Sequence, residues 1–326
     1  MIFSNMKNEF EIKGYPIISI LRDNDRHLTY STKDYNGKDA VVKVWKTIWA
    51  SRNVYKESVR CRFEKGTNIS WPEVIDNDTY LENAFMVTRR YSQSVSEILK
   101  SLEQSWDNKK IEGMFSDIVN GTFEISNEKS QSNALNAAIE TTRLRAAKYS
   151  KTIMTLWMKR CLWFSKKTSS RIPEFSNIQV SRALWKIATY NPDIRYIVEN
   201  HACLHLDHLF IGDEKSWKYV AIDWEHSEIQ PFRYEFLDAA YIFQNLLHRH
   251  SETLAIMFYN EFLSRVEKVI SEKHMHIRTI FMKKILGWMY EMIIDGLNNP
   301  DPKEAFELHT KYLSYFLDSK DITKLR

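Results

Sequence analysis

Residues 14–45 have the hydrophobic pattern of β-strands separated by turns. The run HLTYSTKDY alternates hydrophobic and polar positions, GYPIISIL is β-rich and AVVKVW is an apolar run, and the turn sequences RDND and NGKD separate the three. The pair Asn36-Gly37 is a strong hairpin signal, because both residue types tolerate the positive φ angles of a two-residue turn. A second apolar stretch, SWPEVIDNDTYLENAFMVTRRY at residues 70–91, predicts two further strands.

Helical periodicity dominates the rest of the chain. Apolar residues recur at helical spacing from Thr47 to about Glu64, in long stretches after Ser94, and from Tyr234 to about Leu317. Two short β-rich runs, CLHLDHLFIG and WKYVAIDW, interrupt this pattern and flank the turn-like DEKS. The pattern predicts an α+β chain in which a small β-rich lobe precedes a larger helical lobe with a short β insertion.

A length of 326 residues is consistent with two lobes, which we place at residues 1–90 and 91–326. Hydrophobic residues make up 44% of the chain, so a substantial core can form. The chain has only 8 glycines, and no two lie closer than eight residues. This spacing excludes G-x-G-x-x-G dinucleotide turns, Walker-type phosphate loops and G-x-S-x-G nucleophile elbows, which all need closely spaced glycines.

The net charge of +4 is mild, and overall charge does not predict a nucleic-acid partner. Cys61, Cys161 and Cys203 are odd in number and widely scattered, which is typical of a reducing compartment. No apolar run suits a signal peptide or a membrane span. We therefore expect a cytoplasmic protein. No C-x-x-C or H-E-x-x-H motif is present, which argues against a zinc enzyme.

The most informative segment is HACLHLDHLFIGDEKSWKYVAIDWEH at residues 201–226. It resembles the catalytic segment of the aminoglycoside phosphotransferase and choline-kinase-like family, which has a two-lobed protein-kinase-like fold. That family has H-G-D-L-H-P-G-N, followed by an apolar strand and, about a dozen residues later, I-D-W or I-D-F. Aligned without gaps, His201 falls on the first His, Cys203 on the Asp and His208 on the Asn, and Asp223 falls in the second motif.

Flanking residues follow the same resemblance. PFRYEFLDAAYIF is similar to the family's P-x-Y-D-L-A helix start, with Tyr234 and Glu235 on Tyr-Asp. In AVVKVW, Lys43 stands where the fold keeps a lysine that holds nucleotide phosphates, and Glu57 stands where a helix supplies its carboxylate partner. The strand AFMVTRRY would lead into the hinge that contacts adenine.

The resemblance implies a division of roles, because phosphoryl transfer mainly requires positioning and neutralisation of charge. Lys43 would contact the α/β-phosphates of ATP or GTP, and Glu57 would orient it. Asp223 and His208 would ligate Mg²⁺ or Mn²⁺. The position of Cys203 would hold the acceptor base.

The catalytic loop departs from the family pattern. Cys203 provides a thiol with an ordinary pKa near 8.5 instead of a carboxylate. His208 provides an imidazole, which suits softer metals than Mg²⁺. Asp207 offers a carboxylate that could act as base or metal ligand, and His201 keeps the family's structural histidine within the catalytic loop.

A second register places His205-Leu206-Asp207 on the family's H-x-D. It restores an aspartate, but leaves Gly212 at the metal-ligand position and shortens the spacing to Asp223. We favour the register without gaps.

Residues 141–173 contain nine Lys/Arg and no acidic residue, interleaved with Trp157, Trp163 and Phe164. One interpretation is a basic aromatic helix that makes peripheral contact with an anionic surface. The alternative is a lobe helix whose basic face is simply solvated. A negatively charged acceptor of the phosphoryl group would be compatible with both interpretations.

The leading hypothesis is an ATP-dependent phosphotransferase for a hydroxyl of a sugar, aminoglycoside-like or head-group acceptor. A catalytically impaired pseudokinase that binds nucleotide or a partner is the alternative. A helical protein that associates with membrane or nucleic acid through residues 141–173 is the last choice, because it makes the kinase resemblance coincidental.

Overall fold

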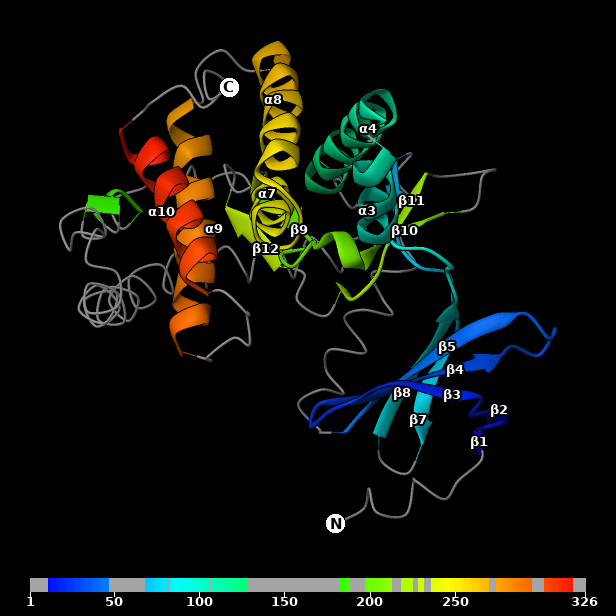
Figure 1. Cartoon of the computed structure of the whole chain (residues 1–326). Coiled ribbons are helices and arrows are strands. Elements are labelled where there is room, and N and C mark those ends of the chain that lie inside the picture. Colours follow the sequence, from blue (N-terminus) through cyan, green and yellow to red (C-terminus); the bar gives the residue numbers. More distant parts are fainter. Residues whose placement is uncertain are drawn as a thin grey trace. The chain divides into compact units, whose positions relative to one another are not determined.

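The chain divides into two compact units. One comprises Met1–Ile98 with Asp207–His226, and the other comprises Leu99–Leu206 with Ser227–Arg326. The computed structural model describes residues 11–46, 68–80, 83–105, 107–127, 182–183, 185–187, 197–212, 218–224, 228–231, 236–269, 274–294 and 302–318. The predicted α+β class is confirmed, with a β-sheet in the first unit and mostly helices in the second (Figure 1).

The first unit is built on an antiparallel sheet with the strand order β3-β4-β5-β8-β7. Its strands are β3 (Ser19–Asp23), β4 (His27–Lys33), β5 (Asp39–Trp45), β7 (Val74–Tyr80) and β8 (Asn83–Arg89). The short strands β1 (Glu11–Ile12) and β2 (Tyr15–Pro16) pair with each other. The runs HLTYSTKDY and AVVKVW form β4 and β5 as predicted, and residues 70–91 supply β7 and β8. The run GYPIISIL is instead divided between β2 and β3, and Arg22 and Asp23 of the predicted turn RDND belong to β3. The helix predicted from Thr47 to Glu64 lies outside the described residues.

The hairpin between β4 and β5 contains Asn36-Gly37, as predicted, but its loop comprises residues 34–38 rather than two residues, and only Gly37 of the pair has a positive φ. Gly37 has a φ of +74°, which a glycine adopts without steric cost. The carboxylate of Asp34 accepts hydrogen bonds from the amides of Asn36 and Lys38 at 2.9 and 2.8 Å. The turn thus sets the register of the two strands that it joins, β4 and β5.

Alternation along these strands separates two faces of the sheet. Tyr30, Val42, Val44, Phe85 and Val87 are buried together on one face. The residues between them in the sequence point to the other face, because successive side chains of a strand alternate. That second face carries the polar residues of the site described below.

A three-stranded sheet in the same unit has the order β10-β11-β6. Its strands are β6 (Ile69–Ser70), β10 (Leu209–Ile211) and β11 (Tyr219–Ala221), and the 3₁₀ turn η1 (Leu206–His208) precedes β10. The rings of Trp71 and Trp224, both buried, lie 4.5 Å apart and join the two segments. The described residues 207–212 and 218–224 therefore pack with the N-terminal part of the chain although they are distant in sequence.

The second unit contains the helices α4 (Asn108–Asn127), α7 (Leu237–Arg249), α8 (Glu252–Val269), α9 (His274–Ile294) and α10 (Pro302–Asp318). The boundary between the units falls within α3 (Val95–Ser105). The strands β9 (Ile197–Asn200) and β12 (Glu228–Pro231) pair antiparallel. Aromatic rings from α7 to α10 form its core, with Phe243 and Phe281 5.3 Å apart. No helix within the described residues is long and apolar enough to cross a membrane.

Candidate functional site

A cavity of about 430 Å³ opens within the first unit, on the polar face of the five-stranded sheet. Thr29, Lys43 and Met86 line it from β4, β5 and β8, while Asp207 and Asp223 line it from the segment around β10 and β11. The volume falls within the range of small-molecule and cofactor sites. The cavity therefore brings together residues that the sequence separates by about 180 positions.

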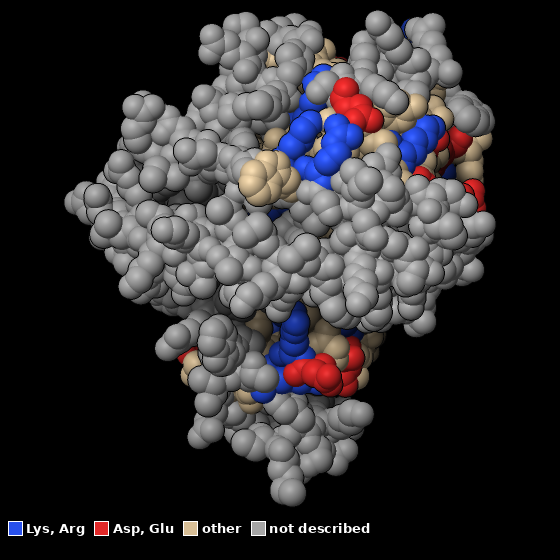
Figure 2. All heavy atoms as spheres, turned by 90° about the vertical axis from the view of Figure 1, so that its left-hand side faces the viewer, with Lys and Arg blue, Asp and Glu red and all other residues tan. Residues whose placement is uncertain are grey.

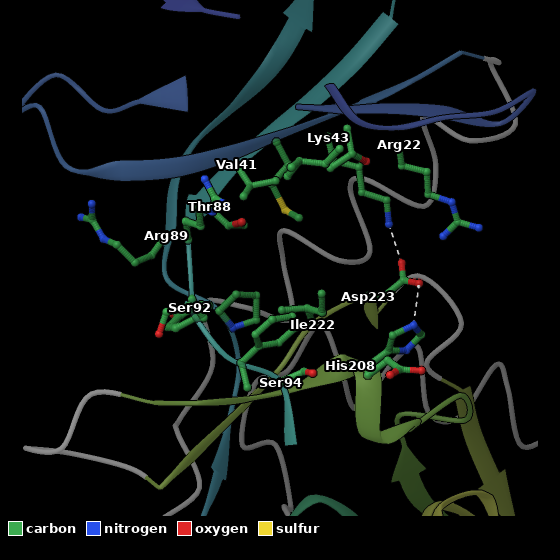
Figure 3. A pocket seen from close by; sticks show the side chains of 18 of the residues that line it. Arg22, Val41, Lys43, Thr88, Arg89, Ser92, Ser94, His208, Ile222 and Asp223 are labelled. Atoms are coloured by element: carbon green, nitrogen blue, oxygen red, sulfur yellow. Dashed lines mark hydrogen bonds and ion pairs between the residues drawn. The ribbon is translucent and has the colours of Figure 1, made fainter. Parts of the chain in front are cut away.

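Lys43 and Asp223 face each other across this cavity (Figure 3). The Lys43 Nζ donates to Asp223 Oδ1 at 2.5 Å, and the two side chains are only 13% and 20% exposed. The same ammonium lies 4.8 Å from the centroid of the Trp45 ring. The lysine is thus held by a carboxylate and an aromatic face, and its charge is directed into the cavity.

Pairing of β10 with β11 brings His208 next to Asp223. Leu209 pairs with Ala221, and the amide of Ile222 donates to the carbonyl of His208 at 2.9 Å. Asp223 follows with a φ of +67°, in the left-handed region that Asp and Asn enter more readily than most residues. Its Oδ2 lies 3.9 Å from the Nε2 of His208 (Figure 3).

The donor set around Asp223 bears on the expected divalent ion. The described residues contain no group of three or more His, Cys, Asp or Glu side chains that could hold a metal by themselves. Asp223 and His208 supply two adjacent donors, and Mg²⁺ in phosphotransfer sites is commonly held by one or two protein ligands together with substrate phosphates. The pair therefore fits an ion that arrives with a nucleotide, and the imidazole favours softer ions than Mg²⁺.

The opposite end of the cavity is formed where β8 ends. The guanidinium of Arg89 pairs with Asp34 at 2.8 Å and with Glu73 at 3.2 Å. Partial burial lowers the pKa of Arg89, but the hydrogen bonds to these carboxylates outweigh it and the net pKa is raised. Ser92, just beyond β8, also lines the cavity. The ion pairs of Arg89 with Asp34 and Glu73 hold the end of β8 beside this part of the cavity.

The loop residues His201, Ala202 and Cys203 belong to the second unit. His201 is fully buried, and the carbonyl of Cys203 accepts a hydrogen bond from the amide of His205 at 3.0 Å. Ala202 has a φ of +64°, a conformation that favours glycine. This is the position at which the family pattern has a glycine, so the backbone agrees with the register that we favour.

Helix α7 holds this loop by its backbone. The buried carboxylate of Asp238 accepts hydrogen bonds from the amides of His201 and Ala202 at 2.8 and 2.9 Å. The Asn245 side chain accepts from the amide of Leu206 at 3.2 Å. These two side chains lie seven residues apart on one face of the helix. The loop conformation is thus fixed by charge-assisted and amide hydrogen bonds from a rigid element.

Sequence comparison missed Asp238. It placed Tyr234 and Glu235 on the family's Tyr-Asp, and both lie outside the described residues. The carboxylate that binds the loop amides stands three residues further on, in FLDAAYIF. A single acid inside an otherwise apolar helix start was the available signal, because a charged residue is rarely buried there without a fixed partner.

Two expectations concern residues outside the described part of the chain, namely Glu57 and residues 141–173. Figure 2 shows one face of the molecule, on which the described basic side chains lie beside acidic ones. The contact of residues 141–173 with an anionic surface stays a prediction.

Comparison with known proteins defines the fold as protein-kinase-like, of the aminoglycoside phosphotransferase type. A thermostable mutant of aminoglycoside phosphotransferase APH(4)-Ia, in ternary complex with ADP and hygromycin B, superposes with a TM-score of 0.56 at 13% identity, covering 98% of this chain and 97% of that chain. ADP-bound APH(2'')-Ib gives 0.51 at 11% identity, covering 98% of each chain.

Amicoumacin kinase hAmiN, in complex with AMP-PNP, Ca²⁺ and Ami, gives a TM-score of 0.52 at 12% identity, covering 100% of this chain and 95% of that chain. No protein-family model and no curated protein sequence matches this chain. The likeness is therefore one of fold, which the resemblance of residues 201–226 predicts.

Proposed function

We propose that this protein is a small-molecule kinase, which transfers a phosphoryl group from ATP or GTP to a hydroxyl of a sugar, aminoglycoside-like or head-group acceptor. The contact of Lys43 with Asp223 inside the cavity carries this proposal. A lysine on a strand and an aspartate at the end of a distant strand are the two charges that phosphoryl transfer requires around a nucleotide. The solved neighbours of this fold include complexes with ADP and AMP-PNP.

Each residue has a distinct task in this proposal. Lys43 binds the α/β-phosphates and Glu57 orients its ammonium, while Asp223 and His208 hold Mg²⁺ or Mn²⁺. When bound, the ion neutralises the charge that develops on the transferred phosphoryl group. The N-terminal lobe, residues 1–90, binds the nucleotide, and residues 91–326 carry the catalytic loop and the acceptor site. The protein acts in the cytoplasm.

The acceptor hydroxyl needs a base, and two residues are candidates. Cys203 stands at the base position, but a thiol with an ordinary pKa near 8.5 is mostly protonated at pH 7. Asp207 lines the cavity and is a carboxylate within the same loop. A general base typically contributes about 10²–10⁴-fold to the rate, so we expect a slow enzyme. His201 supports the loop from its buried position.

A second candidate is a pseudokinase that binds nucleotide or a partner without transfer. Cys203 favours it, because this residue removes a carboxylate at the position where the family has its base. A pseudokinase that binds nucleotide uses the same site as the kinase and differs from it only in turnover, whereas one that binds a partner does not need the nucleotide.

Two measurements separate these possibilities. A thermal-shift scan with ATP or GTP, each with Mg²⁺ or Mn²⁺, tests the nucleotide site, and no shift with any pair contradicts both the kinase and a pseudokinase that binds nucleotide. Turnover of labelled ATP against a panel of hydroxylated acceptors, uncharged and anionic, then tests transfer. Cys203→Asp should raise the rate by about tenfold or more if position 203 is the base site. An unchanged rate assigns the base elsewhere, and Asp207→Asn tests that position.

A further inference from the structure

Four residues form a single row across the sheet on the cavity side. Arg22 pairs with Thr29, Thr29 pairs with Lys43, and Lys43 pairs with Met86. Residues directly opposite each other on adjacent strands share one face of the sheet, and all four line the cavity. Arg22 and Lys43 are therefore two strand spacings apart, about 10 Å at the backbone, and they leave the sheet on the same side.

An irregularity in β3 creates this alignment. The register between β3 and β4 shifts between Ile20 and Arg22, so that Leu21 is the extra residue of a β-bulge. Without the bulge, Leu21 would lie opposite Thr29 and Arg22 would point to the other face, because side chains alternate along a strand. The bulge thus places the guanidinium of Arg22 on the same side of the sheet as Lys43, at the edge of the cavity (Figure 3).

Most backbone amides of the turn that joins β3 to β4 are not available to bind phosphates. In protein kinases a glycine-rich loop at this hairpin covers the nucleotide phosphates. Here the Asn24 side chain accepts hydrogen bonds from the amides of Arg26 and His27, both at 2.9 Å. The amide of Asn24 itself donates to the carbonyl of His27 at 3.1 Å. Three of the four amides in the turn are thus already used within it.

Within the described residues, the side chain of Arg22 makes no hydrogen bond or ion pair, whereas that of Lys43 is paired with Asp223. Extending the proposed function, we infer that Arg22 is a second phosphate-binding cation. It binds the β- and γ-phosphates of the nucleotide in place of the backbone amides of a glycine-rich loop. A guanidinium suits this task because its fork of donors matches phosphate oxygens in a bidentate manner. The inference depends on the nucleotide site proposed above.

Equilibrium binding of adenosine, AMP, ADP and ATP to full-length protein tests this role. Arg22→Ala should weaken ATP and ADP about tenfold or more while leaving adenosine and AMP within about twofold of wild type. Arg22→Lys should fall between the two, because it keeps the charge but loses the fork. Arg26→Ala is the matched control, since Arg26 lies exposed in the same turn and does not line the cavity.

The outcomes separate this inference from the proposed function. Equal losses of ATP affinity in Arg22→Ala and Arg26→Ala would overturn the inference and leave the nucleotide site intact. Wild-type protein that binds inorganic tripolyphosphate through Arg22 but shows no preference for ATP would support the anion role and contradict the nucleotide proposal. Wild-type protein that binds neither probe contradicts both.

Discussion

The ammonium of Lys43 and the carboxylate of Asp223 make a direct contact of 2.5 Å between β5 and the end of β11. Both side chains are largely shielded from water, and Asp223 is further fixed by its neighbour Trp224, whose indole donates to the carbonyl of Ala221. Two separate sheets of the same unit thus aim opposite charges at one point. When a nucleotide binds together with a metal ion, Lys43 would pair with the phosphates and Asp223 with the metal ion, in place of each other.

Replacing Asp223 with Ala should strongly weaken metal-dependent nucleotide binding. The change removes a carboxylate donor and leaves Lys43 in a partly desolvated position without this partner, which we expect to weaken nucleotide–metal affinity about a hundredfold. Isothermal titration with ATP and Mn²⁺ measures the effect. Asp39→Ala is the control, because Asp39 pairs with Lys33 at the exposed start of the same strand β5. Affinity retained in Asp223→Ala would contradict the metal assignment.

Replacing Ala202 with Gly should stabilise the protein. An alanine at φ +64° carries a steric cost of about 1–2 kcal/mol that glycine lacks, and the greater freedom of glycine in the unfolded chain cancels part of it. We expect the free energy of unfolding to rise by up to about 1 kcal/mol, measured by urea denaturation. Ala255→Gly, within α8, should change it in the opposite direction. A loss of stability in Ala202→Gly would show that the loop is not strained.

Much of the fold was predictable because it depends on local patterns. The alternation in HLTYSTKDY, the apolar run AVVKVW and the pair Asn36-Gly37 predict β4 and β5 without knowledge of any partner strand. The family resemblance of residues 201–226 and of AVVKVW placed Asp223 and Lys43 at one site, and both line the same cavity.

The bulge at Leu21 could not be predicted in this way. A shift of one residue in pairing depends on the neighbouring strand and leaves no mark in composition, so Arg22 was not singled out. Asp238 was missed for a related reason, because its importance comes from two backbone amides distant in sequence. Features built on long-range backbone contacts are therefore the ones that sequence patterns overlook.

Replacing Asp238 with Ala should destabilise the protein strongly. The amides of His201 and Ala202 would lose their acceptor, and His201 is fully buried where water does not replace it. We expect a loss of about 3 kcal/mol in the free energy of unfolding, and a smaller loss for Asp238→Asn, which keeps one oxygen acceptor. Glu112→Ala, exposed on α4, should change stability by less than about 0.5 kcal/mol. Comparable values for all three variants would exclude the anchoring role.

Glu252 should make stability depend on pH in the acid range. Partial burial raises its pKa, but hydrogen bonds from Lys311 at 2.6 Å and Tyr312 at 2.8 Å outweigh this and the net pKa lies below the ordinary value of 4.5. A lowered pKa means that the unfolded chain binds the proton more readily, so the stabilisation is complete well above pH 4.5 and is lost as the pH falls below it. The side chain is 35% exposed, so we expect Glu252→Gln to cost less than about 1 kcal/mol at pH 7.

Urea denaturation of wild type and Glu252→Gln between pH 7 and pH 3 measures this contribution. The difference between the two should be constant at neutral pH and shrink as the solution is acidified. Burial, followed by the bond to Glu252, raises the pKa of Tyr312, so this donor keeps its proton throughout the range. Tyr312→Phe removes that bond while leaving Lys311 in place. The effect of Glu252→Gln on stability, measured again in the Tyr312→Phe protein, should therefore depend less on pH but still depend on it. A difference that stays constant down to pH 3 would mean that Glu252 does not stabilise the packing of α8 against α10 through its charge.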